Sequence, residues 1–467
     1  MASEDKTLTK NAFSIAAQKL FIRKVPSYGN TIFYSLGFLA LTCLALLALT
    51  GVIMVFFGSS WWLLNPTGIL LRSIHLWAAQ AFVLIVILHI LVVFSTSGFK
   101  APRRFTWVLG SLAFVAVIFE AEFGYGLRGD FSSQYRALQA ADFYNGAYLG
   151  KFINTLNQAQ VFGLHIIVIP IIIFALGAFH YLLVKARGIA KPYREDVPVT
   201  IVPANHNRLF LRGGILAALI ILLAVVFPSP LVMPTTISGV AGGNPGLMAH
   251  TLVSEFNRTS DTATYLDSID PYAYDTRTVY VTTPYKRLVA TTGTPDELAA
   301  FSAESAALQN QNIAQAGTYF QNGGTLTLNS VDQNPLVSIV SSLTTMANSG
   351  LYEAALNNEN PSINPTYSLR LLDDTGVMAT EAGTLHITTE QWGMMFEEGR
   401  SIPPGAWWLA PLGFLDNTIL ANDANGDRDG VEILGLLVLL FVLFPYIPYV
   451  NRLPEKLHLA ERIWKMR

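Results

Sequence analysis

Apolar residues occur in six long runs along the chain, each long enough to form a helix that crosses a membrane. A hydrocarbon core of about 30 Å takes roughly 20 helical residues. The pattern predicts spans near residues 31–57, 69–95, 106–124, 160–184, 209–227 and 431–450. Between the fifth and sixth runs, residues 231–430 are polar and rich in Thr, Asn, Gly and Ser. We therefore expect an all-α polytopic membrane protein with one large domain outside the membrane.

Basic residues fall on one side of the membrane if the six predicted spans alternate in direction. They lie in the N-terminal segment, in the loops after the second and fourth spans, and in the C-terminal tail. Because basic loops stay in the cytoplasm, both termini are predicted to be cytoplasmic. The predicted domains are a cytoplasmic surface segment that suits an amphipathic helix (1–30), a four-helix core (31–195), a cytoplasmic loop with the fifth span (196–230), an acidic extracytoplasmic domain (231–430), and the sixth span with a basic tail (431–467).

The extracytoplasmic domain is expected to be α+β or largely irregular. It holds 21 acidic against 7 basic residues, a net charge near −14. The electric field of this charge would steer a basic partner. The alternative is that the acidic residues only form a solvated surface suited to a harsh exterior. A capping box at Thr294, with Pro295 and Glu297, predicts one helix start, and segments near 334–356 and 389–398 also look helical. The Trp-rich stretch 401–415 is expected at the outer interface.

Composition supports a membrane protein and excludes several function classes. The chain has 467 residues, of which 52% are hydrophobic and 13% charged, too apolar for a soluble protein of this size. Its net charge of −2 argues against a nucleic-acid partner. With Cys43 as the single cysteine, a disulfide framework, a cysteine-ligated iron–sulfur cluster and a Cys-x-x-Cys-His site for haem c are all excluded.

Two of the apolar runs carry two histidines each. His75 and His89 are fourteen residues apart in the second run, and His165 and His180 are fifteen apart in the fourth. On a helix these spacings keep two side chains within about 40–60° of one face and roughly 21–22 Å apart. Two antiparallel helices would pair His75 with His165 near the outer side, and His89 with His180 near the cytoplasm.

Three interpretations of these histidines differ in what the imidazoles bind. A single intramembrane histidine is often a hydrogen-bonded packing residue, and a series of them can relay protons in a transporter. Four histidines in two matched pairs favour a third interpretation, because two neutral imidazoles are the axial ligands of an electron-carrying haem iron. The pattern therefore predicts two bis-histidine haem b groups.

Glycines recur at the same interval as the histidines. Gly37 and Gly51 lie in the first run and Gly110 and Gly124 in the third, both pairs fourteen residues apart. A glycine at haem depth lets the porphyrin edge approach the backbone. The alternative is that glycine is simply common in membrane helices.

Several stretches match a known family in order and distance. They are NTIFYSLGFLALTC, RSIHLWAAQAFVLIVILHI, GFKAPRRFTWVLG, FGYGL, and HIIVIP followed by His180 and GIAKP. Residues 20–195 resemble the four-helix haem-binding core of cytochrome b from quinol-oxidising cytochrome bc complexes. The resemblance is closest to the plastid, cyanobacterial and Gram-positive branch, in which the two histidines that correspond to His165 and His180 are also fifteen residues apart.

The resemblance implies roles for individual residues. His75 and His165 would hold the outer haem b, and His89 and His180 the inner one. Arg72, one helical turn before His75, looks like the partner of the outer haem's propionates. Basic residues in the cytoplasmic loops are expected beside the inner haem, with the ordinary positive-inside pattern as the alternative: Lys100, Arg103 and Lys185.

The sequence also departs from the family. Ser35 stands where the plastid branch attaches a covalent haem to cysteine, so no covalent haem c is expected. The Leu-Pro-Trp and Pro-Glu-Trp-Tyr motifs of the outer quinol-oxidation site do not occur. Glu120 and Glu122, near Gly124, are expected to accept the quinol proton instead, with helix-end acids at the interface as the alternative. His206 is expected to contact a quinone on the inner side, unless it is an ordinary loop histidine.

The resemblance implies the dihaem cytochrome b subunit of a respiratory complex in a bacterial or archaeal plasma membrane. It would transfer electrons between quinone and outer-face carriers, namely a Rieske iron–sulfur protein and a cytochrome c, in a complex expected to be a homodimer. The alternative is a dihaem conduit and membrane anchor for another outer-face oxidoreductase of dehydrogenase or hydrogenase type. In both cases catalysis belongs to the complex more than to this chain.

Overall fold

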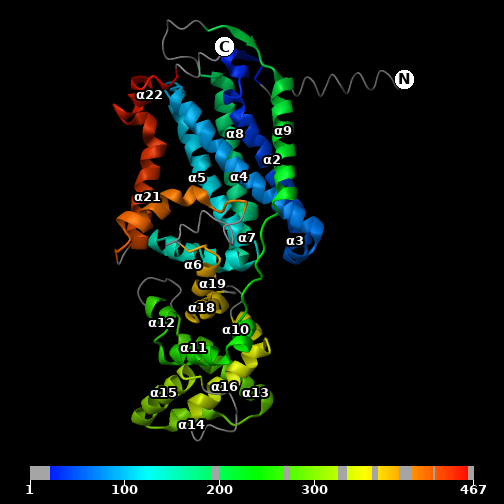
Figure 1. Ribbon diagram of the computed structural model, residues 1–467. Coiled ribbons are helices and arrows are strands. Elements are labelled where there is room, and N and C mark those ends of the chain that lie inside the picture. The colour runs from blue at the N-terminus through cyan, green and yellow to red at the C-terminus, as the bar shows by residue number, and fades with distance from the viewer. Residues whose placement is uncertain are drawn as a thin grey trace, which may run out of the picture. The chain divides into compact units, whose positions relative to one another are not determined.

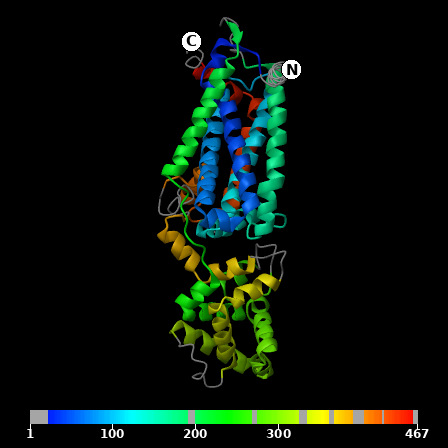
Figure 2. The same ribbon diagram turned by 90° about the vertical axis from the view of Figure 1, so that its right-hand side faces the viewer.

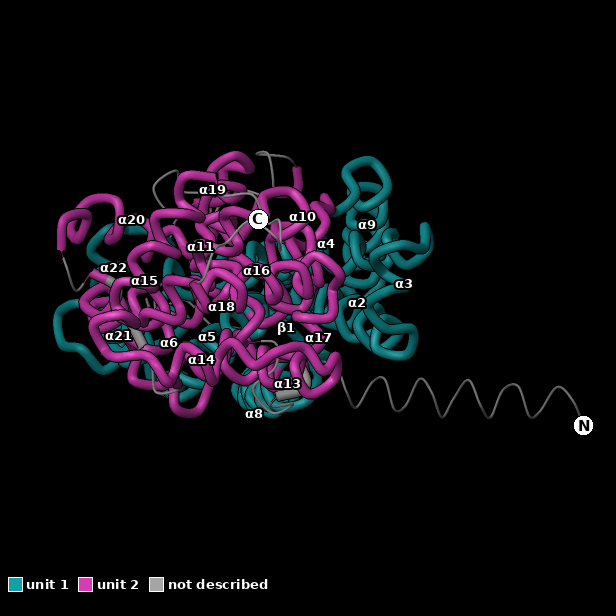
Figure 3. Tube along the Cα trace, turned by 90° about the horizontal axis from the view of Figure 1, so that it is seen from below, with its two compact units in different colours: residues 1–122, 165–229, 434–467 teal, residues 123–164, 230–433 magenta. Residues whose placement is uncertain are grey.

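The computed structural model describes residues 22–190, 199–266, 274–323, 334–359, 366–388, 402–423 and 426–460, and these residues are mostly helical (Figure 1). They divide into two compact units (Figure 3). The first unit comprises residues 1–122, 165–229 and 434–467, and the second comprises residues 123–164 and 230–433. The predicted helix at 389–398 lies outside the described residues.

Six helices among the described residues are long and apolar enough to cross a membrane. They are Phe33–Phe57, Pro66–Ser95, Arg104–Gly126, Gln158–Arg187, His206–Val226 and Arg428–Tyr446. Each overlaps one of the six predicted spans, because a run of about 20 apolar residues is the strongest helix signal a sequence carries. The prediction of an all-α polytopic membrane protein is confirmed.

The elements that form these spans and their connections follow one another along the chain. They are β1 (Lys24–Pro26), the 3₁₀ turns η1 (Ser27–Asn30) and η2 (Phe33–Ser35), α2 (Leu36–Phe57), α3 (Ser59–Leu64), α4 (Pro66–Ser95), α5 (Arg104–Gly126), α6 (Phe131–Gly146), α7 (Gln158–Gly163), the π-helical turn η3 (Leu164–Val168), α8 (Ile169–Arg187), β2 (Ile201–Pro203), α9 (His206–Val226), α21 (Gly426–Leu443), the 3₁₀ turns η10 (Phe444–Tyr446) and η11 (Val450–Arg452), and α22 (Leu453–Lys456).

Local sequence sets where α4, the helix with two histidines, begins. The Asn65 side chain accepts hydrogen bonds from the backbone N–H groups of Thr67 (2.9 Å) and Gly68 (3.4 Å). Pro66 follows at the first helical position, where its missing N–H costs nothing. The helix then runs for 30 residues, long enough to carry both histidines across a membrane.

Helices α2, α4 and α9 of the first unit lie side by side (Figures 1 and 2). On another side of α4 an aromatic cluster joins it to α5, α21 and η10. Its members are Phe94, Phe99, Trp107, Phe441 and Phe444. The Trp107 indole N–H also donates to the Phe441 carbonyl at 3.0 Å, so α21 is fixed to α5 by both packing and a hydrogen bond.

The described part of the N-terminal segment is not the expected surface helix. Residues 24–26 form β1, which pairs antiparallel with β2, Lys24 opposite Pro203 and Pro26 opposite Ile201. Val25 is buried in this pair. A branched residue next to a proline favours extended backbone over helix, which explains the difference. Residues 1–21 lie outside the described part of the chain.

The second unit contains short helices around a buried core. Those beyond the fifth span are α10 (Ile237–Gly243), α11 (Pro245–Asn257), α12 (Asp261–Leu266), the π turn η4 (Thr278–Thr282), α13 (Thr283–Thr292), α14 (Glu297–Ala303), α15 (Ala306–Gln321), α16 (Pro335–Asn348), α17 (Leu351–Glu359), α18 (Thr366–Asp374), α19 (Val377–Thr384), the 3₁₀ turn η8 (Trp407–Leu409), α20 (Ala410–Phe414) and the π turn η9 (Leu415–Ile419). Helix α16 lies at the centre of the core, with Leu336, Ile339 and Leu343 fully buried.

Two expectations for residues 231–430 are corrected. The described residues of this region are helical and contain no strand, so the α+β or irregular character was wrong. The helix expected to start from Thr294 is capped instead by Asp296, whose side chain accepts from Ala299 N at 3.1 Å, and it ends at Ala303. An aspartate nearer the helix provides a stronger cap than the threonine two residues earlier.

Candidate functional site

The four histidines singled out by spacing lie on two spans of the first unit. His75 and His89 are on α4, His165 is in the π turn η3, and His180 is on α8. The structure brings His75 to His165, with ring centroids 6.2 Å apart. It brings His89 to His180, with centroids 6.5 Å apart. These are the two pairs that the spacing predicts.

The separation of the facing rings fits one metal ion between each pair. Metal–imidazole bonds of about 2 Å on both sides, plus a ring radius of about 1 Å each, give centroids about 6 Å apart. Among the described residues, no group of three or more His, Cys, Asp or Glu side chains gathers to hold a metal. A metal with only two protein ligands takes its others from outside the chain, and haem iron takes them from the porphyrin.

The second nitrogen of three rings is held by a hydrogen bond. His165 Nδ1 lies 3.1 Å from the Glu120 carbonyl oxygen, and His180 Nδ1 lies 3.0 Å from the Thr106 carbonyl oxygen. Since a carbonyl only accepts, both rings carry their proton on Nδ1. His75 Nδ1 lies 2.8 Å from Thr50 Oγ1, whose own proton goes to the Leu46 carbonyl at 2.7 Å. In all three rings Nε2 keeps a lone pair for a metal.

Three of the four recurring glycines lie against a histidine ring. A Cβ on Gly51 would come within 3.4 Å of His75 Cε1, and one on Gly37 within 3.7 Å of His89 Cε1. A Cβ on Gly110 would come within 2.9 Å of His180 Cε1, closer than real Cβ contacts. Glycine at position 110 is therefore needed for the imidazole itself to fit beside α5.

Glu120, expected near the outer side as a proton acceptor, touches a histidine. Its Oε1 lies 3.2 Å from His165 Nδ1, and the side chain is 21% exposed. Its Oε2 is buried without a hydrogen-bond partner among the described residues. Glu122 is half-buried on the same helix. The structure thus connects Glu120 to the histidine pairs.

The basic residues expected beside haem propionates occupy two ends of the first unit's spans. Arg72 is buried on α4 and donates to Ser229 Oγ at 3.0 Å. Lys100, between α4 and α5, pairs with Glu455 of α22. The two contacts tie Arg72 to the chain after α9 and Lys100 to α22.

The remaining candidates lie near the loop ends of α8 and α9. Arg103 donates to the Arg187 carbonyl at 2.9 Å and so closes the end of α8. Lys185 is in the last turn of α8. His206 begins α9, and its Nε2 lies 3.1 Å from the Ile22 carbonyl oxygen. Nothing in this geometry brings His206 to a histidine pair.

Sequence reasoning missed the residues that orient the rings. Thr50 and Thr106 are 25 and 74 residues away from the histidines that they contact. A threonine in an apolar helix is usually hydrogen-bonded to its own helix, as Thr50 also is. No periodicity within one segment could have revealed contacts between separate spans.

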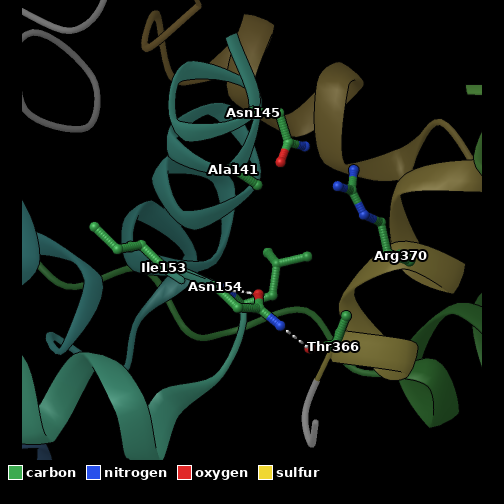
Figure 4. Close-up of a pocket in the computed structure, with 7 residues that line it drawn as sticks. Ala141, Asn145, Ile153, Asn154, Thr366 and Arg370 are labelled. Atoms are coloured by element: carbon green, nitrogen blue, oxygen red, sulfur yellow. Dashed lines mark hydrogen bonds between the residues drawn. The ribbon is translucent and has the colours of Figure 1, made fainter. Parts of the chain in front are cut away.

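A small cavity in the second unit is lined by Ala141, Asn145, Ile153, Asn154, Leu156, Thr366 and Arg370 (Figure 4). Asn154 Nδ2 donates to Thr366 Oγ1 across it at 3.2 Å. Its volume of about 10 Å³ holds about one water molecule. The cavity is too small for a cofactor or substrate.

Comparison with known proteins supplies the family. Residues 80–234 match the family described as cytochrome b (N-terminal)/b6/petB. Cytochrome b6 of Synechocystis sp. is 34% identical over 191 residues, which are 36% of this chain and 85% of that protein. The chain belongs to the cytochrome b family. As a member it is an integral membrane protein, and the family implies haem b as its cofactor.

Other relatives match a similar part of this cytochrome b chain. Cytochrome b6 of Desmonostoc sp. is 31% identical over 202 residues, covering 38% of this chain and 92% of that protein. Cytochrome b6 of Heliobacterium modesticaldum is 30% identical over 190 residues, covering 36% and 89%. The resemblance to the cyanobacterial and Gram-positive branch is confirmed for about a third of the chain.

A solved structure titled "Hyperthermophilic respiratory Complex III" also aligns with the chain. It is 17% identical, with a TM-score of 0.38, and the alignment covers 76% of this chain and 94% of that one. A TM-score this low does not establish a shared fold.

Proposed function

We propose that this cytochrome b family member is the dihaem subunit of a respiratory cytochrome bc-like complex. It would bind two haem b groups, one between His75 and His165 and one between His89 and His180. The two groups would transfer electrons across the membrane between quinone and carriers at the outer face. The observation that carries the proposal is the pair of facing imidazole couples, 6.2 and 6.5 Å between centroids.

The chain's own residues would hold and orient the cofactors. Bound haem b would supply one-electron redox chemistry. Nδ1 hydrogen bonds to Thr50, Glu120 and Thr106 aim three Nε2 atoms between α4 and the segment η3–α8. Cations at the span ends would pair with the propionates: Arg72 for the outer haem, and Lys100, Arg103 and Lys185 for the inner one.

Quinone and protein partners complete the proposal. Glu122 would accept a proton from quinol near the outer haem, and His206 would contact quinone on the inner side. The partners would be a Rieske iron–sulfur protein and a cytochrome c, with the acidic outer domain facing them. The complex would lie in a bacterial or archaeal plasma membrane, with both termini cytoplasmic and residues 231–430 outside.

A second candidate function keeps the haems and changes the partner. The chain lacks the Leu-Pro-Trp and Pro-Glu-Trp-Tyr motifs of the family's outer quinol-oxidation site. This favours an electron conduit and anchor for another outer-face oxidoreductase of dehydrogenase or hydrogenase type. Subunits that purify with the native complex decide between the two: a Rieske protein supports the first, and a dehydrogenase or hydrogenase supports the second.

Spectra of the purified protein test the haem assignment. We expect a reduced-minus-oxidised spectrum of two b haems, with no haem left on the chain after denaturing electrophoresis. Alanine at His89 or His180 should remove the inner haem alone, because each substitution would leave one of the two histidines that would hold it. Alanine at His75 or His165 should remove the outer haem alone.

His250→Ala, on α11 of the second unit, is the matched control and should keep both haems. Loss of different haems on substitution of two paired histidines would contradict the pairing. A wild-type protein without a b-type spectrum would refute the haem proposal, and would favour a histidine proton relay.

A further inference from the structure

The two histidine pairs have different electrostatic surroundings, beginning with His165. Its Nδ1 lies 3.1 Å from the backbone oxygen of Glu120 and 3.2 Å from the Oε1 of the same residue. One N–H therefore points at a carbonyl and a carboxylate together, a three-centre hydrogen bond. Carboxylate–histidine–metal arrangements raise the basicity of the coordinated imidazole.

Glu120 needs a counter-charge. It lies in the span Arg104–Gly126, where an acidic side chain is expensive unless it is paired. Its Oε2 is buried without a hydrogen-bond partner, and among the described residues His165 is the only basic side chain within ion-pairing distance. The ferric porphyrin core of a haem with two neutral imidazoles, its propionates aside, carries one net positive charge, so iron held by His165 would supply the missing charge.

At the inner pair, the group that accepts from the imidazole N–H is neutral and is followed by a cation. His180 Nδ1 lies 3.0 Å from the Thr106 carbonyl, which is neutral. The hydroxyl of the same threonine accepts a hydrogen bond from Arg187 Nη1 at 2.9 Å. The Arg187 guanidinium therefore contacts the threonine that holds His180, whereas the Glu120 carboxylate contacts His165 itself. A nearby cation disfavours the positively charged ferric state, and a nearby anion favours it.

We propose that Glu120 is a positioning residue that lowers the reduction potential of the outer haem relative to the inner one. The inference rests on the proposed function, since it assumes haem iron between the histidines. The carboxylate stabilises the ferric outer haem through the His165 N–H, and Arg187 stabilises the ferrous inner haem through Thr106. Electron transfer from the outer to the inner haem is then favourable.

Redox titration of the purified complex, followed by the b-haem spectrum, tests the proposal. Glu120→Gln keeps a side-chain acceptor and removes the charge. We expect the outer haem alone to shift to a higher potential, by about tenfold in its reduced-to-oxidised ratio at fixed ambient potential, or about 59 mV. Arg187→Gln should shift the inner haem alone, to a lower potential. Asp423→Asn, at an exposed acidic position of the second unit, is the control for the loss of one carboxylate and should leave both potentials unchanged.

The outcomes separate this inference from the proposed function. Two b haems with an unmoved outer potential in Glu120→Gln would overturn the role of Glu120 and leave the haem assignment intact. If Glu120→Gln loses its outer haem, Glu120→Asp and Glu120→Asn are compared instead. An outer potential at the wild-type value in Glu120→Asp supports the role of the negative charge. An outer potential raised equally in both variants overturns that role. A wild-type protein without two b haems would refute the proposed function itself.

Discussion

Gly110 shows how closely one residue can limit the space around His180, in the proposed inner haem site. A methyl group there would lie 2.9 Å from His180 Cε1 and 3.1 Å from His180 Nδ1. Because the ring is also held to Thr106, it cannot turn away without losing its hydrogen bond. We expect Gly110→Ala to cost about 1–3 kcal/mol through overpacking and to reduce occupancy of the inner haem.

The measurement is the haem-to-protein ratio in the b-type spectrum. Gly177→Ala, on α8 with open space around the added Cβ, is the matched control and should keep both haems. Full inner-haem occupancy in Gly110→Ala would show that the contact is relieved by a small shift of α5.

Residues differ in how far sequence could assign them. His75 and His89 are visible as a pair because both lie on one helix at a spacing that preserves its face. Glu120 is visible as an intramembrane acid, but its contact with His165 joins two spans and depends on tertiary structure. Sequence therefore predicts which side chains are unusual and not which atoms they meet.

At the scale of the element, the π turn η3 explains the uneven histidine spacing. Leu164–Val168 form a π-helical turn with His165 inside it, directly before α8. A π turn holds one residue more than an α turn, so fifteen residues cover the rotation that fourteen cover on α4. Pro170, at the start of α8, lacks the N–H that an α-helical turn would use and so favours the wider turn.

Deleting Ile167 tests this account of the spacing. We expect η3 to close into an α turn, leaving His165 and His180 fourteen residues apart and both facing α4. The variant should therefore keep two b haems. Inserting one alanine after Leu176, within α8, should rotate His180 by about 100° and remove the inner haem. If the deletion removed one haem as the insertion does, the π turn would not be what sets the register.

Helix length determined which elements the sequence could predict. The six spans are apolar over 18 residues or more, and each was found within a few residues of its ends. The helices of the second unit are shorter, and their starts depend on single caps such as Asn334, whose side chain accepts from Leu336 N at 3.0 Å. A cap is one residue among many Asn, Ser and Thr, so the region looked irregular.

At the scale of the whole molecule, the second unit carries acidic groups inside its core as well as on its surface. Glu255 is fully buried and interacts with Asp374, whose Oδ1 accepts from Thr262 N at 2.9 Å. Two neighbouring carboxylates repel each other in a buried site, so both burial and this repulsion favour a protonated carboxyl. Burial and the neighbouring Asp374 raise the pKa of Glu255 well above its ordinary value, and burial raises that of Asp373 to about 6.

These raised pKa values predict that Glu255 and Asp373 stabilise the second unit more in acid than at neutral pH. A carboxyl whose pKa is higher in the folded than in the unfolded state binds its proton more tightly when folded. Its contribution is complete below the unfolded pKa, ordinarily 4.5 for Glu255, and is lost as pH rises toward the folded value. We expect Glu255→Gln, which keeps a neutral hydrogen-bonding group, to remove most of this loss.

Limited proteolysis of the full chain at pH 4 and pH 8 measures the effect. At each pH the cleavage rate of the variant is divided by that of the wild type, so the protease's own pH dependence cancels. Glu255→Gln should match wild type at pH 4 and be cleaved in the second unit at least about tenfold more slowly at pH 8. Asp423→Asn, at an exposed position, is the control and should match wild type at both pH values. Equal rates for Glu255→Gln and wild type at pH 8 would mean that the buried pair does not govern opening. The expected pattern would support the proposal that residues 231–430 face an acidic exterior, where buried carboxyls stay protonated.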